Sequence, residues 1–198
     1  MILYDGSSWA WGDTLKDREN DRYSSLVGGE HVNISECGKS NDGILRTTIE
    51  YCENNPVDIA VIQLTKISRR EILQDLNSLY RILPKKNSDI CNAYYRYLHN
   101  PYDDLANFYK NKFLLENYFE SKQIKYLLMS LMRPKDSKGI LKKSSWEKMS
   151  KKEIMSLYQL FGGTKRDNLP YFDEHQKNDG HPNEKGHQKI ADYVLQNL

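Results

Sequence analysis

The stretch Met1-Ile-Leu-Tyr-Asp-Gly-Ser-Ser-Trp-Ala-Trp-Gly12 organises the whole chain. Its apolar start, Ile2–Tyr4, predicts a short buried strand, and the turn-forming cluster Asp5–Ser8 predicts a tight bend directly after it. Open α/β sheets bind their ligands at the carboxyl ends of the strands. The sequence therefore places the hydroxyl of Ser8 where such a fold would hold a site.

Three further apolar segments predict strands, at His31–Ser35, Asp58–Leu64 and Ile124–Leu131. The second of them is almost continuously apolar, as central parallel strands are. Helical patterns lie between the strands, and this alternation predicts an α/β domain with a parallel sheet. We find no internal repeat and no domain boundary, so residues 1–198 are expected to form a single domain.

Several other segments carry weaker local patterns. We expect a helix from Arg70 to about Ile82, a long helix from Pro101, and a last helix that carries Ile190 and Val194. The remaining expectations are a polar loop at 13–21, a lysine-rich surface excursion at 133–150, a short helix at 151–160 and an edge strand at 169–172.

The composition narrows the class of protein. A net charge of +2 and a pI near 8.3 are too mild to indicate a nucleic-acid partner. No apolar run approaches the roughly 18 residues that a membrane span needs, and no signal peptide is recognised, so we expect a cytoplasmic protein without a membrane partner. Cys37, Cys52 and Cys91 follow no metal-ligand spacing and are expected to be reduced thiols.

The segment Asn178-Asp-Gly-His-Pro-Asn-Glu-Lys-Gly-His187 carries the second set of candidate residues. The imidazole of His181 is suited to act as a general base, and Asp179 could orient it as the third member of a catalytic triad does. A serine becomes a good nucleophile only beside such a base. We therefore predict that folding brings Ser8 and His181 together, although Ser8 could equally be a turn residue and His181 a packing residue of the last loop.

Two residues after the second predicted strand could hold a negative charge beside Ser8. The backbone N–H of Gly38 and the side-chain amide of Asn41 are candidate oxyanion donors, and a glycine turn and a helix cap are the simpler interpretations. A metal site built from His175, His181 and His187 is an alternative, but the spacing matches no standard ligand pattern. His187 itself is expected to pack within the last helix.

These blocks together resemble the SGNH hydrolase superfamily, the GDSL-like esterases and lipases, and above all its small bacterial and phage members. The residues that carry the resemblance are 2–12, 33–42 and 179–187, in the family's order. The resemblance implies a flavodoxin-like three-layer α/β/α sandwich with a central parallel sheet of four to five strands. It also implies Ser8 as nucleophile, Gly38 as oxyanion donor and His181 as base.

Three positions depart from the family pattern. The acidic residue before the nucleophile is Ser7, and the Asn that usually follows the third strand is Ile67, which cannot donate a hydrogen bond. The residue three before His181 is Asn178, and Asp179 lies one position off. Losing one oxyanion donor lowers turnover by about 100- to 1000-fold, so reduced activity is expected unless Asn41, Gln63 or Thr65 substitutes.

The resemblance implies a serine esterase that needs no cofactor and no metal. Its partner would be a small-molecule acyl or acetyl ester, with esters on a carbohydrate among the candidates. The alternative is a catalytically degenerate domain of the same fold that binds a sugar, a nucleotide or a protein, and Ser7 and Ile67 favour that alternative. The sequence does not indicate an oligomeric state.

Overall fold

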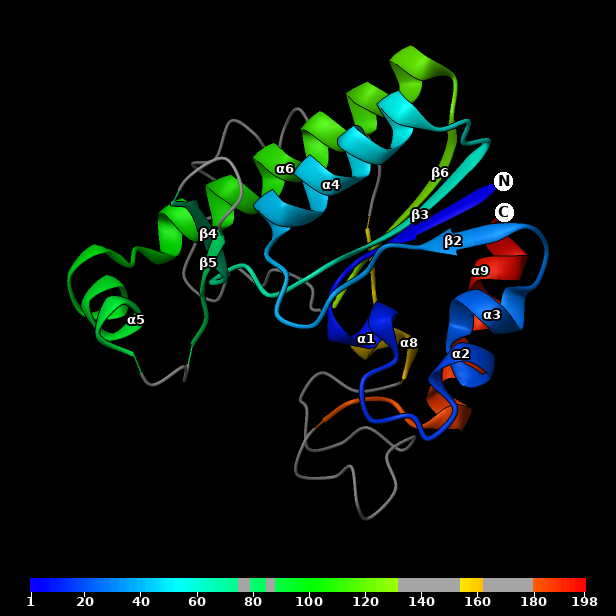
Figure 1. Ribbon diagram of the computed structural model, residues 1–198, viewed down its shortest axis with the longest axis horizontal. Coiled ribbons are helices and arrows are strands. Elements are labelled where there is room, and N and C mark those ends of the chain that lie inside the picture. The colour runs from blue at the N-terminus through cyan, green and yellow to red at the C-terminus, as the bar shows by residue number, and fades with distance from the viewer. Residues whose placement is uncertain (75–78, 85–87, 132–153, 162–179) are drawn as a thin grey trace.

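Five parallel strands in the order β2-β1-β3-β6-β7 form the centre of the protein (Figure 1). The structure is a computed structural model, and it describes residues 1–74, 79–84, 88–131, 154–161 and 180–198. The strands of the sheet are β1 (Ile2–Asp5), β2 (His31–Asn33), β3 (Ile59–Leu64), β6 (Lys125–Ser130) and β7 (Met155–Ser156). The prediction of an α/β fold with a parallel sheet of four to five strands is confirmed.

Helices cover both faces of this sheet and make the fold a three-layer α/β/α sandwich (Figure 1). The helices are α1 (Ser8–Trp11), α2 (Arg18–Asp21), α3 (Tyr23–Val27), α4 (Asn41–Asn54), α5 (Asp89–Ala93), the π-helix η1 (Tyr94–Leu98), α6 (Pro101–Lys122), α8 (Leu157–Leu160) and α9 (Glu184–Asn197). Helices α4 and α6 lie side by side on one face, and α1, α3, α8 and α9 lie on the other.

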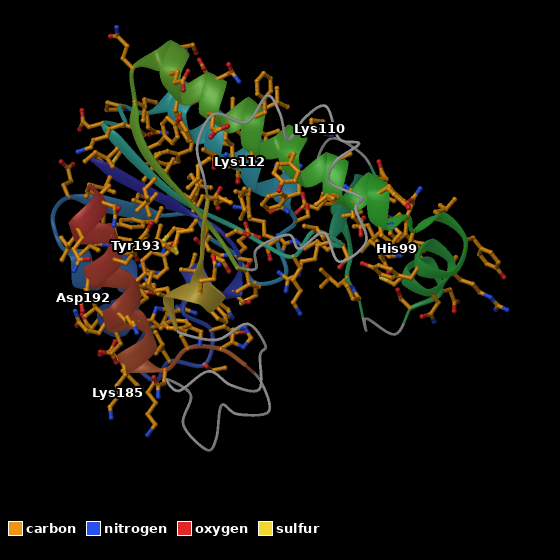
Figure 2. The ribbon with its side chains drawn as sticks, turned by 180° about the vertical axis from the view of Figure 1, so that it is seen from behind. His99, Lys110, Lys112, Lys185, Asp192 and Tyr193 are labelled. Carbon is orange, nitrogen blue, oxygen red and sulfur yellow. The ribbon has the colours of Figure 1, made fainter. Side chains whose placement is uncertain are left out.

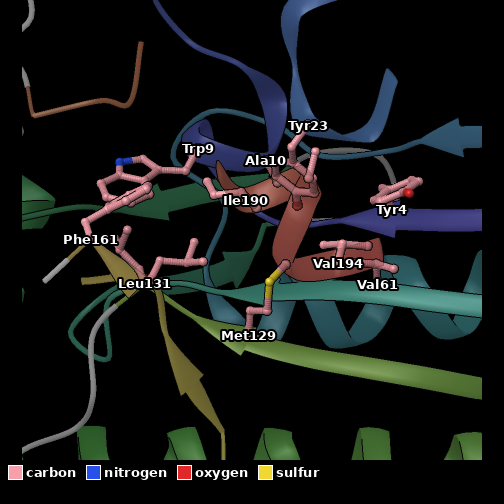
Figure 3. Packing of buried hydrophobic residues seen from close by; sticks show 12 residues of the cluster. Tyr4, Trp9, Ala10, Tyr23, Val61, Met129, Leu131, Phe161, Ile190 and Val194 are labelled. Carbon is pink, nitrogen blue, oxygen red and sulfur yellow. The ribbon is translucent and has the colours of Figure 1, made fainter. Parts of the chain in front are cut away.

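The apolar core divides into two clusters because successive residues of a strand point to opposite faces of the sheet. On β3, Ala60 and Ile62 pack toward α4 and α6, whereas Val61 packs toward α9. Figure 3 shows the cluster that contains Val61, in which Ile190 and Val194 of α9 pack against the sheet. The apolar face predicted for the last helix is thus confirmed.

The segment from Arg70 to Ile82 is not the helix that its pattern predicts. It forms an antiparallel pair, β4 (Arg70–Leu73) and β5 (Leu79–Ile82), which stands apart from the main sheet. The extended backbone lets Arg70 reach Asp103 and Asp104 at the start of α6, at 2.7 and 3.1 Å. These ion pairs join residues far apart in the sequence, so a local helical pattern does not reveal them.

Other predictions fare as follows. The long helix from Pro101 is confirmed as α6, capped by Asn100, whose side chain accepts a hydrogen bond from the N–H of Tyr102. The polar stretch 13–21 contains the short helix α2, and 151–160 contains β7 followed by α8. The predicted surface excursion at 133–150 and edge strand at 169–172 lie outside the described residues.

Strands β4 and β5 with α5 and η1 form an arm beside the sandwich (Figure 1). Seen from behind, His99 lies at the base of this arm, far from α9 with its labelled Lys185 and Tyr193 (Figure 2). The ring of His99 contacts Asp104 at 2.8 Å and so ties the arm to α6. None of the helices formed by the described residues is both long and apolar enough to cross a membrane.

Candidate active site

Ser8 stands at the first position of α1, directly beyond the carboxyl end of β1. The turn before it is tight: a Cβ added to Gly6 would lie 2.7 Å from the Cβ of Ala10 and 2.9 Å from that of Gln63. The backbone N–H and the hydroxyl of Ser7 both donate to Oε1 of Gln63, each at 3.3 Å. Gln63 of β3 thus fixes the turn that presents the Ser8 hydroxyl.

His181 reaches the same point from the other end of the chain. Its Nε2 lies 2.9 Å from the Oγ of Ser8, across a sequence separation of 173 residues. Asn183 caps α9 by accepting a hydrogen bond from the N–H of Gly186, which fixes the backbone just after the histidine. The structure therefore brings together Ser8 and His181, the two residues that the sequence predicts to be nucleophile and base.

A carboxylate that the sequence reasoning missed lies beside this pair. Oδ2 of Asp13 is 3.7 Å from Nε2 of His181, so a proton taken from Ser8 would lie close to a negative charge. Asp13 follows Trp11 and Gly12, in the stretch 13–21 that the sequence predicts to be a surface loop. Asp179 and Asn178, the two residues predicted to orient His181, lie outside the described residues, so this role stays a prediction.

The thiol of Cys37 lies near the carboxylate of Asp13. Partial burial, followed by the nearby Asp13 carboxylate, raises the pKa of Cys37 to about 11. The thiol is therefore protonated at neutral pH, and the thiolate is the reactive form of cysteine. Cys37 therefore lies near the site, and its protonated thiol is a weaker candidate nucleophile than Ser8.

Gly38 has the backbone geometry of a turn that presents its N–H group. Its φ of 78° lies in the left-handed region that favours glycine. Among the hydrogen bonds of the described residues, neither the N–H of Gly38 nor that of Ser8 has an acceptor. The oxyanion role that the resemblance implies for Gly38 stays a prediction, and these two N–H groups are its candidates.

Asn41 is buried and holds the loop after β2 against the end of β3. Its Oδ1 accepts a hydrogen bond from the N–H of Thr65 at 2.8 Å, and its Nδ2 donates to the Thr65 carbonyl at 3.4 Å. The cap of α4 is Ser40, whose Oγ accepts a hydrogen bond from the N–H of Gly43, and Asn41 is the first residue of the helix. The proposed oxyanion role of Asn41 remains a prediction, and the observed contacts are those of an anchor.

A buried ion pair lies beneath the site. Asp5 is fully buried, and its Oδ1 accepts hydrogen bonds from the N–H of Gly6 and from Nζ of Lys39, both at 2.7 Å. Its Oδ2 accepts from the hydroxyls of Thr47 at 2.7 Å and Thr48 at 2.9 Å. The pair thus joins the turn that carries Ser8 to the loop that carries Gly38, and the sequence reasoning identified neither partner.

His187 packs as predicted and lies behind the site. Its ring is fully buried, and Nδ1 accepts a hydrogen bond from the N–H of Tyr23 at 3.1 Å. Burial, with a smaller contribution from His181, lowers the pKa of His187 to about 3. His175, another member of the alternative metal site, lies outside the described residues, and the described part of the chain groups no three metal-ligating side chains.

The neutral state of His187 makes stability depend on pH. Above its ordinary pKa of 6.5 the ring is neutral in both states; below it, only the unfolded chain takes up the proton. Stability should therefore fall with acidification between pH 6.5 and about 3, by up to about 1.4 kcal/mol per pH unit from this residue. Urea unfolding at several pH values measures this dependence in the wild type and in His187→Gln, which keeps an acceptor but cannot titrate. Identical slopes of unfolding free energy against pH in the two proteins would contradict the prediction.

Comparison with known proteins agrees with this fold. No protein-family model matches the sequence, and no curated protein matches it either. Among solved structures, an esterase from Pseudoalteromonas sp. is 16% identical, with a TM-score of 0.59, over 99% of this chain and 94% of its own. A Desulfitobacterium hafniense protein described as belonging to the lipolytic G-D-S-L family is 15% identical, with a TM-score of 0.59, over 100% and 98% of the two chains.

A variant of an acetyl-xylooligosaccharide esterase from Geobacillus stearothermophilus is also similar, with 14% identity and a TM-score of 0.55. This match covers 99% of the present chain and 92% of the other. At such identities the likeness shows the fold. The chain has the α/β/α fold of the GDSL-type, or SGNH, lipolytic proteins and esterases, as the sequence resemblance implied.

Proposed function

We propose that the protein is a serine esterase of the SGNH type. The observation that carries this proposal is the 2.9 Å contact between the Oγ of Ser8 and Nε2 of His181 at the carboxyl edge of the sheet. A histidine at this distance can take the hydroxyl proton as Ser8 attacks an ester carbonyl, and can return it to the leaving alcohol. Water then repeats the cycle on the acyl-enzyme, and no cofactor is required.

The oxyanion formed in each step would be held by the N–H groups of Ser8 and Gly38. Asp179, or its neighbour Asn178, would orient His181, and the Asp13 carboxylate lies 3.7 Å from its Nε2. The proposed substrate is a small acyl or acetyl ester, including esters on a carbohydrate. The acetyl-xylooligosaccharide esterase among the structural neighbours supports that substrate class.

A binding protein of the same fold is the second candidate. Ile67, at the position where the resemblance implies an Asn, packs against the apolar cluster beneath α4 and α6. That position therefore contributes no polar group to the site, which favours recognition of a sugar, a nucleotide or a protein without hydrolysis. A folded protein that neither hydrolyses esters nor reacts with a serine-directed phosphonate would favour this candidate.

Hydrolysis of p-nitrophenyl acetate by the wild type and by Ser8→Ala tests the esterase proposal. We expect the variant to lose activity by about 10⁴-fold or more, because no other group can form the acyl-enzyme. Ser121→Ala, a surface serine of α6 whose hydroxyl donates to the carbonyl of Tyr118, is the matched control and should retain wild-type turnover. Equal turnover in Ser8→Ala and the wild type would refute the proposed nucleophile.

A further inference from the structure

The site as described has two backbone oxyanion donors, and the three side chains considered as a third are all engaged elsewhere. Asn41 is bonded to the Thr65 backbone. Gln63 accepts from Ser7 and donates to the Leu64 carbonyl at 2.7 Å. The hydroxyl of Thr65 accepts a hydrogen bond from Nη1 of Arg69 at 2.9 Å. Arg69 is thus bonded to the residue that directly follows β3.

Arg69 lies between the loops that follow β2 and β3. Besides Thr65, its Nη1 donates a hydrogen bond to the carbonyl of Lys39 at 3.5 Å. Lys39 and Cys37 are the two residues that flank Gly38. The guanidinium therefore contacts the loop that carries Gly38, the candidate oxyanion donor.

Within the described part of the chain, Arg69 has no carboxylate counter-ion. Arg70 and Arg81, its neighbours in the chain and on β5, both pair with carboxylates. No carboxylate of the described ranges forms an ion pair with Arg69, and its two hydrogen bonds use a neutral hydroxyl and a carbonyl. A guanidinium has five N–H donors, and the hydrogen bonds that Arg69 makes to described residues use only those of Nη1.

We infer that Arg69 is the third oxyanion donor, in place of the amide that is absent at Ile67. This inference rests on the proposed esterase function. As the Oγ of Ser8 bonds to the carbonyl carbon, the π electrons of the carbonyl move to its oxygen, and that negative charge lies between the Gly38 N–H and the guanidinium. When the C–O bond to the alcohol breaks, the electrons return and the charge at Arg69 disappears. A donor that meets its anion only in the transition state raises kcat and leaves KM nearly unchanged.

Steady-state kinetics of Arg69→Ala with a neutral ester, p-nitrophenyl acetate, tests this assignment. We expect kcat to fall by about 100-fold with KM within a few-fold of the wild-type value. Guanidinium chloride below the unfolding transition should restore part of kcat, whereas sodium chloride at equal ionic strength should not. Such rescue is specific to the missing cation, and Arg46→Ala, on the outer face of α4, is the control that should respond to neither salt.

Three results would overturn the assignment. The first is an Arg69→Ala variant with wild-type kcat, and the second is a folded variant that guanidinium cannot rescue. The third is a loss confined to the KM of esters with a carboxylate in the acyl group, which would make Arg69 a substrate anchor. A wild-type protein without turnover would instead remove the esterase reaction, and the role of Arg69 with it.

Discussion

His181→Ala is expected to lower kcat for p-nitrophenyl acetate by about 10⁵-fold while the protein remains folded. The expectation follows from the 2.9 Å contact with Ser8, since a serine hydroxyl without an adjacent base is a weak nucleophile at neutral pH. The loss should be about as large as that caused by Ser8→Ala, and the double variant should lose little more, because the two residues act as one unit.

The control for this prediction is His31→Ala. His31 lies on β2, where its Nδ1 contacts the carbonyl of Gly29 at 3.0 Å, and it has no contact with Ser8. Its variant should keep kcat within a few-fold of the wild type. If His181→Ala retained kcat within tenfold of the wild type while circular dichroism showed a native fold, His181 would not be the base.

Breaking the buried pair of Asp5 and Lys39 should cost the most stability. The two side chains are 0% and 1% exposed and 2.7 Å apart, so Asp5→Asn leaves an ammonium buried without its counter-ion. Removing one partner of such a pair costs about 3–5 kcal/mol of unfolding free energy. Activity should fall as well, because Lys39 and the Gly6 N–H of the turn before Ser8 both bind Oδ1 of Asp5, so loss of the ion pair disturbs that turn.

A double-variant cycle separates the charge from the packing. Asp5→Asn with Lys39→Met removes both charges and should be more stable than Asp5→Asn alone when unfolding by urea is measured. Lys122→Met is the matched control, since Lys122 pairs with Glu53 on an exposed surface and should show no measurable change. Additive effects of Asp5→Asn and Lys39→Met would show that the two charges are not coupled in the folded protein.

Local patterns predicted most of the sandwich. The strands β1, β2, β3 and β6 and the helices α4, α6 and α9 carry a hydrophobic period that their burial on the sheet preserves. The pattern failed between Arg70 and Ile82, where ion pairs to α6 outweigh local helical preference. It also missed α2, a single turn that Asp17 caps by accepting from the N–H of Asn20.

The candidate site was likewise predicted only in part, because local motifs identify some of its residues and long-range contacts bring in the others. Ser8, Gly38 and His181 stand in recognisable motifs, and the structure places Ser8 against His181. Asp13 and Arg69 stand in no motif, and Lys39 stands in the second block but has no role that the motif predicts. Their contacts depend on which loops meet at the carboxyl edge of the sheet. A single sequence does not show how close these loops come to one another.

The most direct measurement for the central claim is fluorophosphonate labelling followed by peptide mapping of the adduct. We predict one phosphonyl group per chain, attached to the peptide that contains Ser8, and none on Ser8→Ala or on the heat-unfolded wild type. Labelling of another residue, or no labelling of the folded wild type, would contradict an activated Ser8–His181 pair.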